Sequence, residues 1–120
     1  MSDGYPVQWA GRTAIVTLPQ HVGEFNASRI RDQLLLLIYR GATELVVDMT
    51  GTAWCDQVGA AVVARACRRA AACGTQLRLV VTAEAVGRLP ALKGLDRLIR
   101  IHPSLDDAVA ATMPTATVRW

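Results

Sequence analysis

The residues best suited to chemistry gather in one stretch, from Glu44 to Gly59, which reads ELVVDMTGTAWCDQVG. Its two aspartates, Asp48 and Asp56, could form an acid/base pair, since such chemistry uses two carboxyl groups held at different pKa values. A simpler interpretation is structural: Asp48 ends an apolar strand, and Asp56 precedes a helix, where a carboxylate accepts hydrogen bonds from free amides. The stretch therefore predicts a strand, a loop and a helix N-terminus, the place where partners and ligands usually dock in an open α/β sheet.

No catalytic or phosphate-binding motif accompanies these aspartates. The chain has no GxGxxG, GKS/GKT or GxSxG sequence. His21 and His102 stand far apart in the sequence, and we interpret both as loop residues rather than catalysts or ligands. The sequence therefore predicts no enzyme, no metal site and no cofactor.

Three cysteines are present, an odd number whose spacing matches no zinc site. We interpret Cys67 and Cys73 as small core or boundary residues of one helix. Cys55 lies beside a predicted helix N-terminus, where a thiolate would be stabilised. It is therefore the one candidate for a reactive thiol.

Composition limits the classes of function. The 120 residues are 52% apolar and only 5% aromatic, with a net charge of +3, which predicts one domain over 1–120 (core about 5–112) with an aliphatic core and no row of rings for stacking nucleic-acid bases. The longest apolar run, 34–39, is too short to span a bilayer, and the first residues do not resemble a signal peptide, so we expect a soluble, cytoplasmic protein. Only Arg65, Arg68 and Arg69 cluster; we interpret them as a solvated helix face, the alternative being a patch for an acidic partner or nucleic acid.

The elements that must position the focal stretch alternate along the chain. An antiparallel pair of strands is predicted over 5–9 and 13–18, followed by a loop over 19–25. Asn26 is expected to cap a helix that ends at Gly41. Strands over 45–49, 76–81 and 98–101 then alternate with helices over 57–72, 83–89 and from Ser104 onward. The tail from Pro114 shows no clear pattern. The order β-β-α-β-α-β-α-β-α predicts an α/β fold with a mixed, mostly parallel sheet.

The focal stretch resembles the signature of STAS domains, especially bacterial anti-sigma factor antagonists. The resemblance rests on Asp48-Met49-Thr50-Gly51 and on Trp54 to Gly59, and is extended by Gly74-x-x-Leu77-x-Leu79 and Leu92-x-Gly94-Leu95-x-x-Leu98. It covers about 5–112 and implies a STAS-like single domain. It also implies a non-enzymatic antagonist that binds an anti-sigma factor with serine-kinase activity. In that family, the kinase phosphorylates a hydroxyl residue of Asp-Ser-Ser/Thr-Gly, and the added charge of about −1.5 to −2 weakens the complex.

This sequence departs from the family pattern where the switch should be. Val58 occupies the acceptor position and Gln57 the serine before it, whereas Asp56 and Gly59 are retained. Since valine has no hydroxyl group, phosphorylation at this position is impossible. Three hypotheses follow: a permanently binding-competent antagonist, a domain with a different partner, or a protein regulated elsewhere, for example at Thr52, Thr82 or Cys55.

The predicted partner surface is the loop from residue 52 to residue 59 with the exposed face of the following helix. Trp54 fits core packing, where the family has an apolar residue, or an exposed anchor for a partner. The alternatives to an antagonist are a STAS subunit of a transporter or sensory complex and a small-ligand sensor. We expect no direct binding of nucleic acid, no membrane insertion, and a monomer or a homodimer. The residues predicted to contact the partner are Thr52, Trp54, Asp56, Gln57, Val58, Gly59, Arg65 and Arg69.

Overall fold

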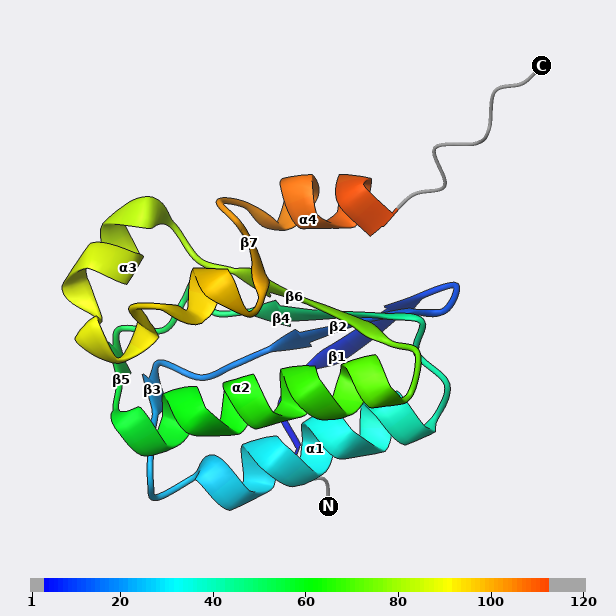
Figure 1. The fold of residues 1–120 in the computed structure, drawn as a ribbon, viewed down its shortest axis with the longest axis horizontal. Coiled ribbons are helices and arrows are strands. Elements are labelled where there is room, and N and C mark those ends of the chain that lie inside the picture. The colour runs from blue at the N-terminus through cyan, green and yellow to red at the C-terminus, as the bar shows by residue number, and fades with distance from the viewer. Residues whose placement is uncertain (1–3, 113–120) are drawn as a thin grey trace.

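In a computed structural model that describes residues 4–112, five strands form a sheet in the order β1-β2-β4-β6-β7 (Figure 1). β1 (Val7–Ala10) and β2 (Thr13–Thr17) make the predicted antiparallel hairpin. β4 (Glu44–Asp48), β6 (Gln76–Val80) and β7 (Arg100–His102) follow in parallel. The prediction of a mixed, mostly parallel sheet is confirmed. The predicted tail from Pro114 lies outside the described residues.

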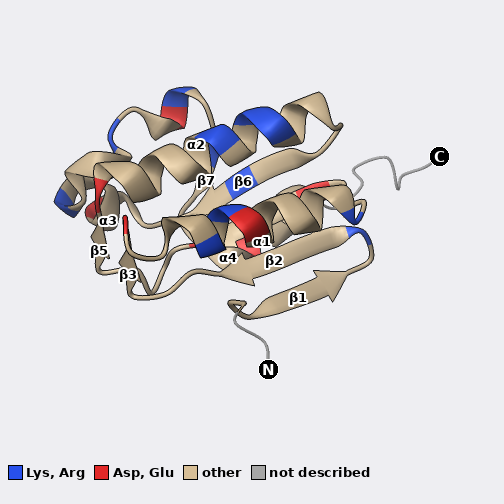
Figure 2. Cartoon of the chain, turned by 90° about the horizontal axis from the view of Figure 1, so that it is seen from below, with Lys and Arg blue, Asp and Glu red and all other residues tan. Residues whose placement is uncertain are grey.

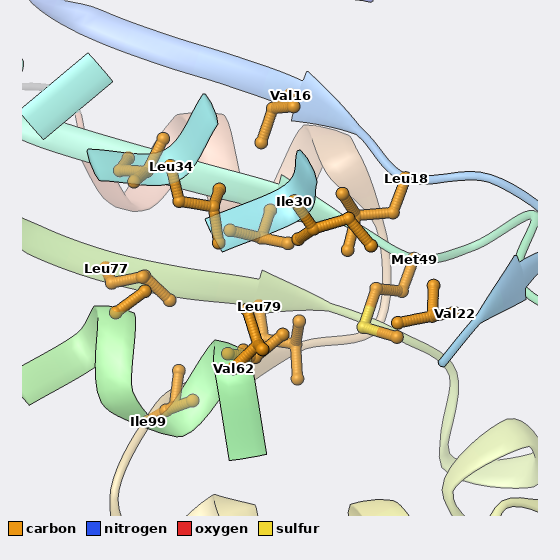
Figure 3. Close-up of a cluster of buried hydrophobic side chains, with 14 of the residues drawn as sticks. Val16, Leu18, Val22, Ile30, Leu34, Met49, Val62, Leu77, Leu79 and Ile99 are labelled. Atoms are coloured by element: carbon orange, nitrogen blue, oxygen red, sulfur yellow. The ribbon is translucent and has the colours of Figure 1, made fainter. Parts of the chain in front are cut away.

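Two long helices cover one face of this sheet. α1 (Ala27–Tyr39) and α2 (Gln57–Ala72) lie side by side beneath it (Figure 1). α1 buries residues at helical spacing, including Ile30, Leu34 and Leu37, as its apolar pattern predicts. Figure 3 shows the aliphatic core that results, in which Leu77 and Leu79 of β6 lie in one cluster with side chains of the helices, such as Ile30 and Val62. The core holds the β4 strand, and hence the loop that follows it, in a fixed place.

The remaining helices lie at one end of the sheet and on its other face. α3 (Ala83–Arg88) and two 3-10 turns, Pro90–Leu92 and Leu95–Arg97, connect β6 to β7. α4 (Leu105–Thr112) packs on the opposite face, where Ala108 meets Ile15, Val46 and Val80. The sheet is therefore covered on both faces, as the unbroken apolar run of β4 predicts.

The expectation of a plain loop over 19–25 was wrong. β3 (His21–Val22) pairs in parallel with β5 (Trp54–Cys55), forming a second sheet of two short strands. Asn26 holds the N-cap position of α1, as predicted, but its side chain makes no capping hydrogen bond. Its Oδ1 instead accepts a hydrogen bond from the Gly23 N–H at 2.9 Å, and its Nδ2 donates to the His21 carbonyl at 2.8 Å. Asn26 thus fixes the loop between β3 and α1.

The start of the last strand differs from the prediction, whereas the end of α2 agrees with it. The last strand begins at Arg100, because the chain at 95–97 turns as a 3-10 helix and leaves Leu98 exposed. α2 ends at Ala72, as predicted, and Gly74 follows it with a φ of +79°, which is unfavourable for other residues. The N–H groups of Gly74 and Thr75 donate to the carbonyls of Ala71 and Ala70, which closes the helix in a Schellman motif. Cys73, expected in the core or at its boundary, is exposed.

Candidate partner-binding surface

The loop after β4 is held by its own polar side chains. The buried Asp48 accepts hydrogen bonds from the Thr50 N–H at 2.9 Å and the Thr50 hydroxyl at 2.7 Å. Thr52 is buried, and its hydroxyl donates to the Pro19 carbonyl at 2.9 Å. These contacts explain the polar residues of the loop structurally, and they place the Thr52 hydroxyl inside the protein rather than on the surface where we expected partner contact.

Asp56 closes the N-terminus of α2, as the sequence predicts. Its Oδ1 accepts a hydrogen bond from the Gly59 N–H at 2.8 Å, and its Oδ2 accepts one from the Glu24 N–H at 3.1 Å. These two amides, that of Gly59 foremost, hold the pKa of Asp56 below its ordinary value. The carboxylate therefore ties α2 to the loop before α1, and both of its oxygens are engaged in that contact.

We expect Asp56→Asn to destabilise the fold at neutral pH and to have less effect in acid. Because the folded-state pKa of Asp56 is lowered, its charge contributes stability above the unfolded-state pKa of about 3.9 and loses that contribution as the pH falls through the folded-state value. Denaturant unfolding of both proteins between neutral pH and about pH 2.5 measures the difference. A difference that stays constant throughout would contradict the assignment. Asp96→Asn, at an exposed carboxylate, controls for loss of charge alone.

The first turn of α2 lies directly against β3. Gly59 is buried, and the backbone of Val22 occupies the space that a side chain at Gly59 would need. The Asp56 N–H donates to the Val22 carbonyl at 3.1 Å, which continues the pairing of β3 with β5. Gly59 therefore supports the surface from within, and a partner would meet the residues before it.

Three predicted residues do reach the surface beside this helix end. Trp54 is 46% exposed and Val58 is 43% exposed, and Gln57 between them in the chain is exposed as well. The Trp54 ring stands edge-on to His21, with 6.2 Å between ring centroids. It also lies close to Gly23, where an added Cβ would come within 2.6 Å of the Trp54 Cζ3 atom. Of the two interpretations of Trp54, core packing is wrong and exposure is confirmed.

Phe25 is an exposed aromatic residue that the sequence reasoning missed. It is 71% exposed in the loop between β3 and α1, next to Glu24, whose amide binds Asp56. The sequence could have indicated this residue, because the only phenylalanine of the chain stands in a polar loop. We call Phe25, Trp54, Gln57 and Val58 together the α2 N-terminal surface. Exposed apolar side chains around a helix end are typical of a protein-binding site.

The two predicted arginines lie farther along α2, on the side that faces α1. Arg69 donates from Nε to the Tyr39 hydroxyl at 2.9 Å, and its guanidinium carbon lies 5.8 Å from the centre of the Tyr39 ring. Arg65 is exposed one turn earlier. Figure 2 shows basic residues on both helices and no acidic residue on α2. The structure thus separates the predicted residues into an apolar part at the helix end and a basic part along it.

Cys55, the one candidate for a reactive thiol, does not have the surroundings that such a thiol needs. Cys55 is buried, and burial, followed by the nearby charge of Asp56, raises the pKa of its thiol to about 11. Burial also raises the pKa of Cys67, whereas Cys73 is exposed. The N-terminus of α2 does not stabilise a Cys55 thiolate, because the Asp56 carboxylate already occupies its amides.

We therefore expect an aromatic disulfide reagent near neutral pH to modify Cys73 quickly, Cys67 slowly and Cys55 only after unfolding. The release of chromophore, followed in native and denatured protein, gives the number of thiols in each phase. Cys73→Ser should remove the fast phase. A fast phase that survives this change and disappears with Cys55→Ser would contradict the buried position of Cys55.

Within residues 4–112, no three His, Cys, Asp or Glu side chains come together as a metal site would require. Over the same residues, no helix has both the length and the apolar character needed to cross a bilayer.

Thr82, the other hydroxyl considered for regulation, is exposed, and its oxygen accepts a hydrogen bond from the Ala85 N–H at the start of α3.

Comparison with known proteins bears on the fold and the family. The family model of the STAS domain matches residues 6–108. An anti-sigma factor antagonist from Mycobacterium paratuberculosis has 21% identity and a TM-score of 0.77, covering 88% of this chain and 90% of that one. The Bacillus cell fate determinant SpoIIAA in its phosphorylated form has 16% identity and a TM-score of 0.68, with 92% and 100% covered. The search of curated proteins finds no match.

A third solved structure comes from a different kind of protein. The murine solute carrier 26 family member A9 anion transporter, in its inward-facing state, has 20% identity and a TM-score of 0.70. The similarity covers 87% of this chain but only 18% of the transporter chain. Such low identities show a shared fold and leave function to the site. The family match includes the whole β4–α2 region that carries the sequence resemblance, and the chain belongs to the STAS domain family.

Proposed function

We propose that this STAS domain is an anti-sigma factor antagonist that binds an anti-sigma factor of the serine-kinase type and is not switched by phosphorylation at residue 58. The single observation that carries the proposal is the α2 N-terminal surface. Trp54 and Val58 are both nearly half exposed there, on a helix end that Asp56 and Gly59 hold in place. This arrangement is suited to binding a protein.

No hydroxyl group is present at the position where the family is phosphorylated. Val58 has none, and Gln57 before it has none. The Thr52 hydroxyl is buried and donates to a backbone carbonyl, so a kinase would have to unfold the loop to reach it. Thr82 is exposed, but it belongs to α3 rather than to the α2 N-terminal surface. A complex formed through this surface would therefore not be dissociated by phosphorylation at residue 57 or 58.

The proposal is tested with purified anti-sigma kinases from the same cell. We expect one of them to bind the wild-type protein by calorimetry, with an affinity that ATP does not reduce over time. The Val58→Ser variant should bind as well, become phosphorylated at residue 58, and then dissociate. The absence of binding by any such kinase would refute the proposal. Phosphorylation of the wild-type protein with loss of binding would refute the absence of a switch.

A second candidate function is suggested by the similarity to the murine anion transporter, in which the matching part is 18% of the chain. This chain would then act as a subunit of a membrane transport or sensory complex. The discriminating measurement is co-purification from native membranes after detergent extraction. Recovery of a transporter with the domain, and of no anti-sigma kinase, would favour this candidate over the first.

A further inference from the structure

A groove of about 430 Å³ runs between α1 and α2 and opens beside Val58. Its apolar lining comes from Ala27 and Leu35 of α1 and from Val62 and Ala66 of α2. From Val58 to Arg69 the groove follows twelve residues of α2, whose eleven steps span about 16 Å at 1.5 Å per residue. A helix of about three turns has the same length.

The rim of this groove is basic. Arg31 of α1 and Arg65 and Arg69 of α2 line it, and Glu24 is the acidic residue at its border. α2 itself carries Arg65, Arg68 and Arg69 and no acidic residue. The positive charge of this helix is therefore not neutralised along its own exposed face.

The three rim arginines differ in how far they are already engaged. Arg31 forms an ion pair with Asp32 at 3.1 Å, and Arg69 binds the Tyr39 hydroxyl. Within residues 4–112, no acidic side chain forms an ion pair with Arg65. Arg65 is therefore free to pair with a carboxylate from outside the chain.

We propose that the groove binds an acidic amphipathic helix of the partner protein, with its apolar face on the groove floor and its carboxylates on Arg65 and Arg69. This inference extends the proposed function, because the groove opens beside Val58 and would enlarge the contact made there. The binding mode is a helix in a groove, in which apolar residues at i, i+3, i+4 and i+7 enter the floor. The basic rim sets the charge of the partner and the orientation of its helix.

The shape of the site favours a helix over a membrane or a nucleic acid. A membrane surface is met by a projecting apolar face with basic residues around it, whereas here the apolar side chains lie at the bottom of a groove. Nucleic-acid backbones are bound by a continuous basic surface without need of an apolar floor, and this rim is interrupted by Glu24. Both alternatives remain distinguishable by experiment.

The probe is a fluorescent peptide of fifteen residues with leucine at i, i+3, i+4 and i+7 positions and glutamate elsewhere. A scrambled peptide of equal composition has the same charge but no apolar face. We expect the amphipathic peptide to bind the full-length protein by fluorescence anisotropy, and Arg65→Glu to weaken it about tenfold or more. Arg68→Glu is the matched control, because Arg68 lies on the same exposed helix and does not line the groove. It should weaken binding less than threefold.

Several outcomes would overturn the inference. These are no binding of the amphipathic peptide, equal binding of the scrambled peptide, or equal losses from Arg65→Glu and Arg68→Glu. Binding of anionic phosphatidylglycerol vesicles or of a short duplex DNA, lost in Arg65→Glu while the peptide fails, would assign the groove to a membrane or to nucleic acid instead.

Failure of this inference can be told apart from failure of the proposed function. If an anti-sigma kinase binds the wild-type protein and the Arg65→Glu variant equally, the proposed function stands and the groove inference fails. If the amphipathic peptide binds as expected and no anti-sigma kinase does, the groove inference stands and the antagonist function fails.

Discussion

Replacing Gly59 by alanine is expected to destabilise the protein, although alanine is the better helix former. A Cβ at Gly59 would lie 2.7 Å from the Val22 Cγ1 atom and 2.9 Å from the Val22 carbonyl oxygen. Overpacking of this kind costs about 1–3 kcal/mol, whereas alanine in place of a helical glycine gains about 1 kcal/mol. The cost should be the larger effect here, because the carbonyl belongs to the backbone and the Val22 side chain is fully buried.

Gly87→Ala is the matched control, with the opposite expected sign. Gly87 lies within α3, and an added Cβ would meet no atom within 4 Å. The change should therefore stabilise the fold by about 0.4–1 kcal/mol. Thermal unfolding measures both variants, at about 3–5 °C for each kcal/mol in a domain of this size. If Gly59→Ala melts at or above the wild-type temperature, the contact between α2 and β3 leaves room for a Cβ at residue 59, contrary to the distances above.

The contact between α2 and β3 involves a strand that the sequence did not predict. The parallel strands were predictable, because β4 is a continuous apolar run and β6 alternates around Leu77 and Leu79, each between turn residues. β3 was not, since two residues, His21 and Val22, form no periodic pattern and owe their strand conformation to pairing with β5. Asn26 was assigned as a cap because asparagine commonly caps helices. Its side chain instead binds the backbone of Gly23 and His21, a tertiary arrangement that local preference cannot reveal.

The candidate site was predictable to a similar degree. The cap at Asp56 follows from local rules, since a carboxylate before a helix accepts hydrogen bonds from its first amides. The exposure of Trp54 and the burial of Thr52 do not, because both depend on the direction of a loop that packs against Pro19 and Gly23. The same reasoning applies to Cys55. Its position beside a helix N-terminus suggested a stabilised thiolate, but the charge of Asp56 and burial act in the opposite direction.

The division of the surface into an apolar helix end and a basic groove has a consequence for recognition. Contacts at Trp54 and Val58 would supply affinity through buried apolar area, and the arginines along α2 would supply orientation and association rate. Salt should therefore affect the second contribution and leave the first largely unchanged. A partner that engages both would be held even where no covalent switch exists at residue 58.

Replacing Val58 by glutamate is expected to abolish binding to the anti-sigma kinase while leaving the fold intact. The side chain of Val58 is 43% exposed, so glutamate can be accommodated without displacing the core. A carboxylate in the first turn of α2 also interacts favourably with the helix dipole, by about 0.3–1 kcal/mol. At the interface, the same charge would lie against a partner surface shaped for an apolar side chain. The loss of affinity should exceed about thirtyfold, which corresponds to roughly 2 kcal/mol.

Leu98→Glu provides the control for the charge change alone. Leu98 is 40% exposed, close to the value for Val58, and follows the 3-10 turn at Leu95–Arg97, outside the α2 N-terminal surface. The substitution therefore introduces the same charge in place of a similarly exposed apolar side chain. Calorimetry against the kinase, with thermal unfolding of each variant, separates binding from folding. If Val58→Glu and Leu98→Glu reduce affinity equally, the effect is one of net charge, and the α2 N-terminal surface is not where the partner binds. If only Val58→Glu does so, a negative charge at residue 58 is sufficient to prevent binding, and valine at that position is what keeps the domain competent to bind.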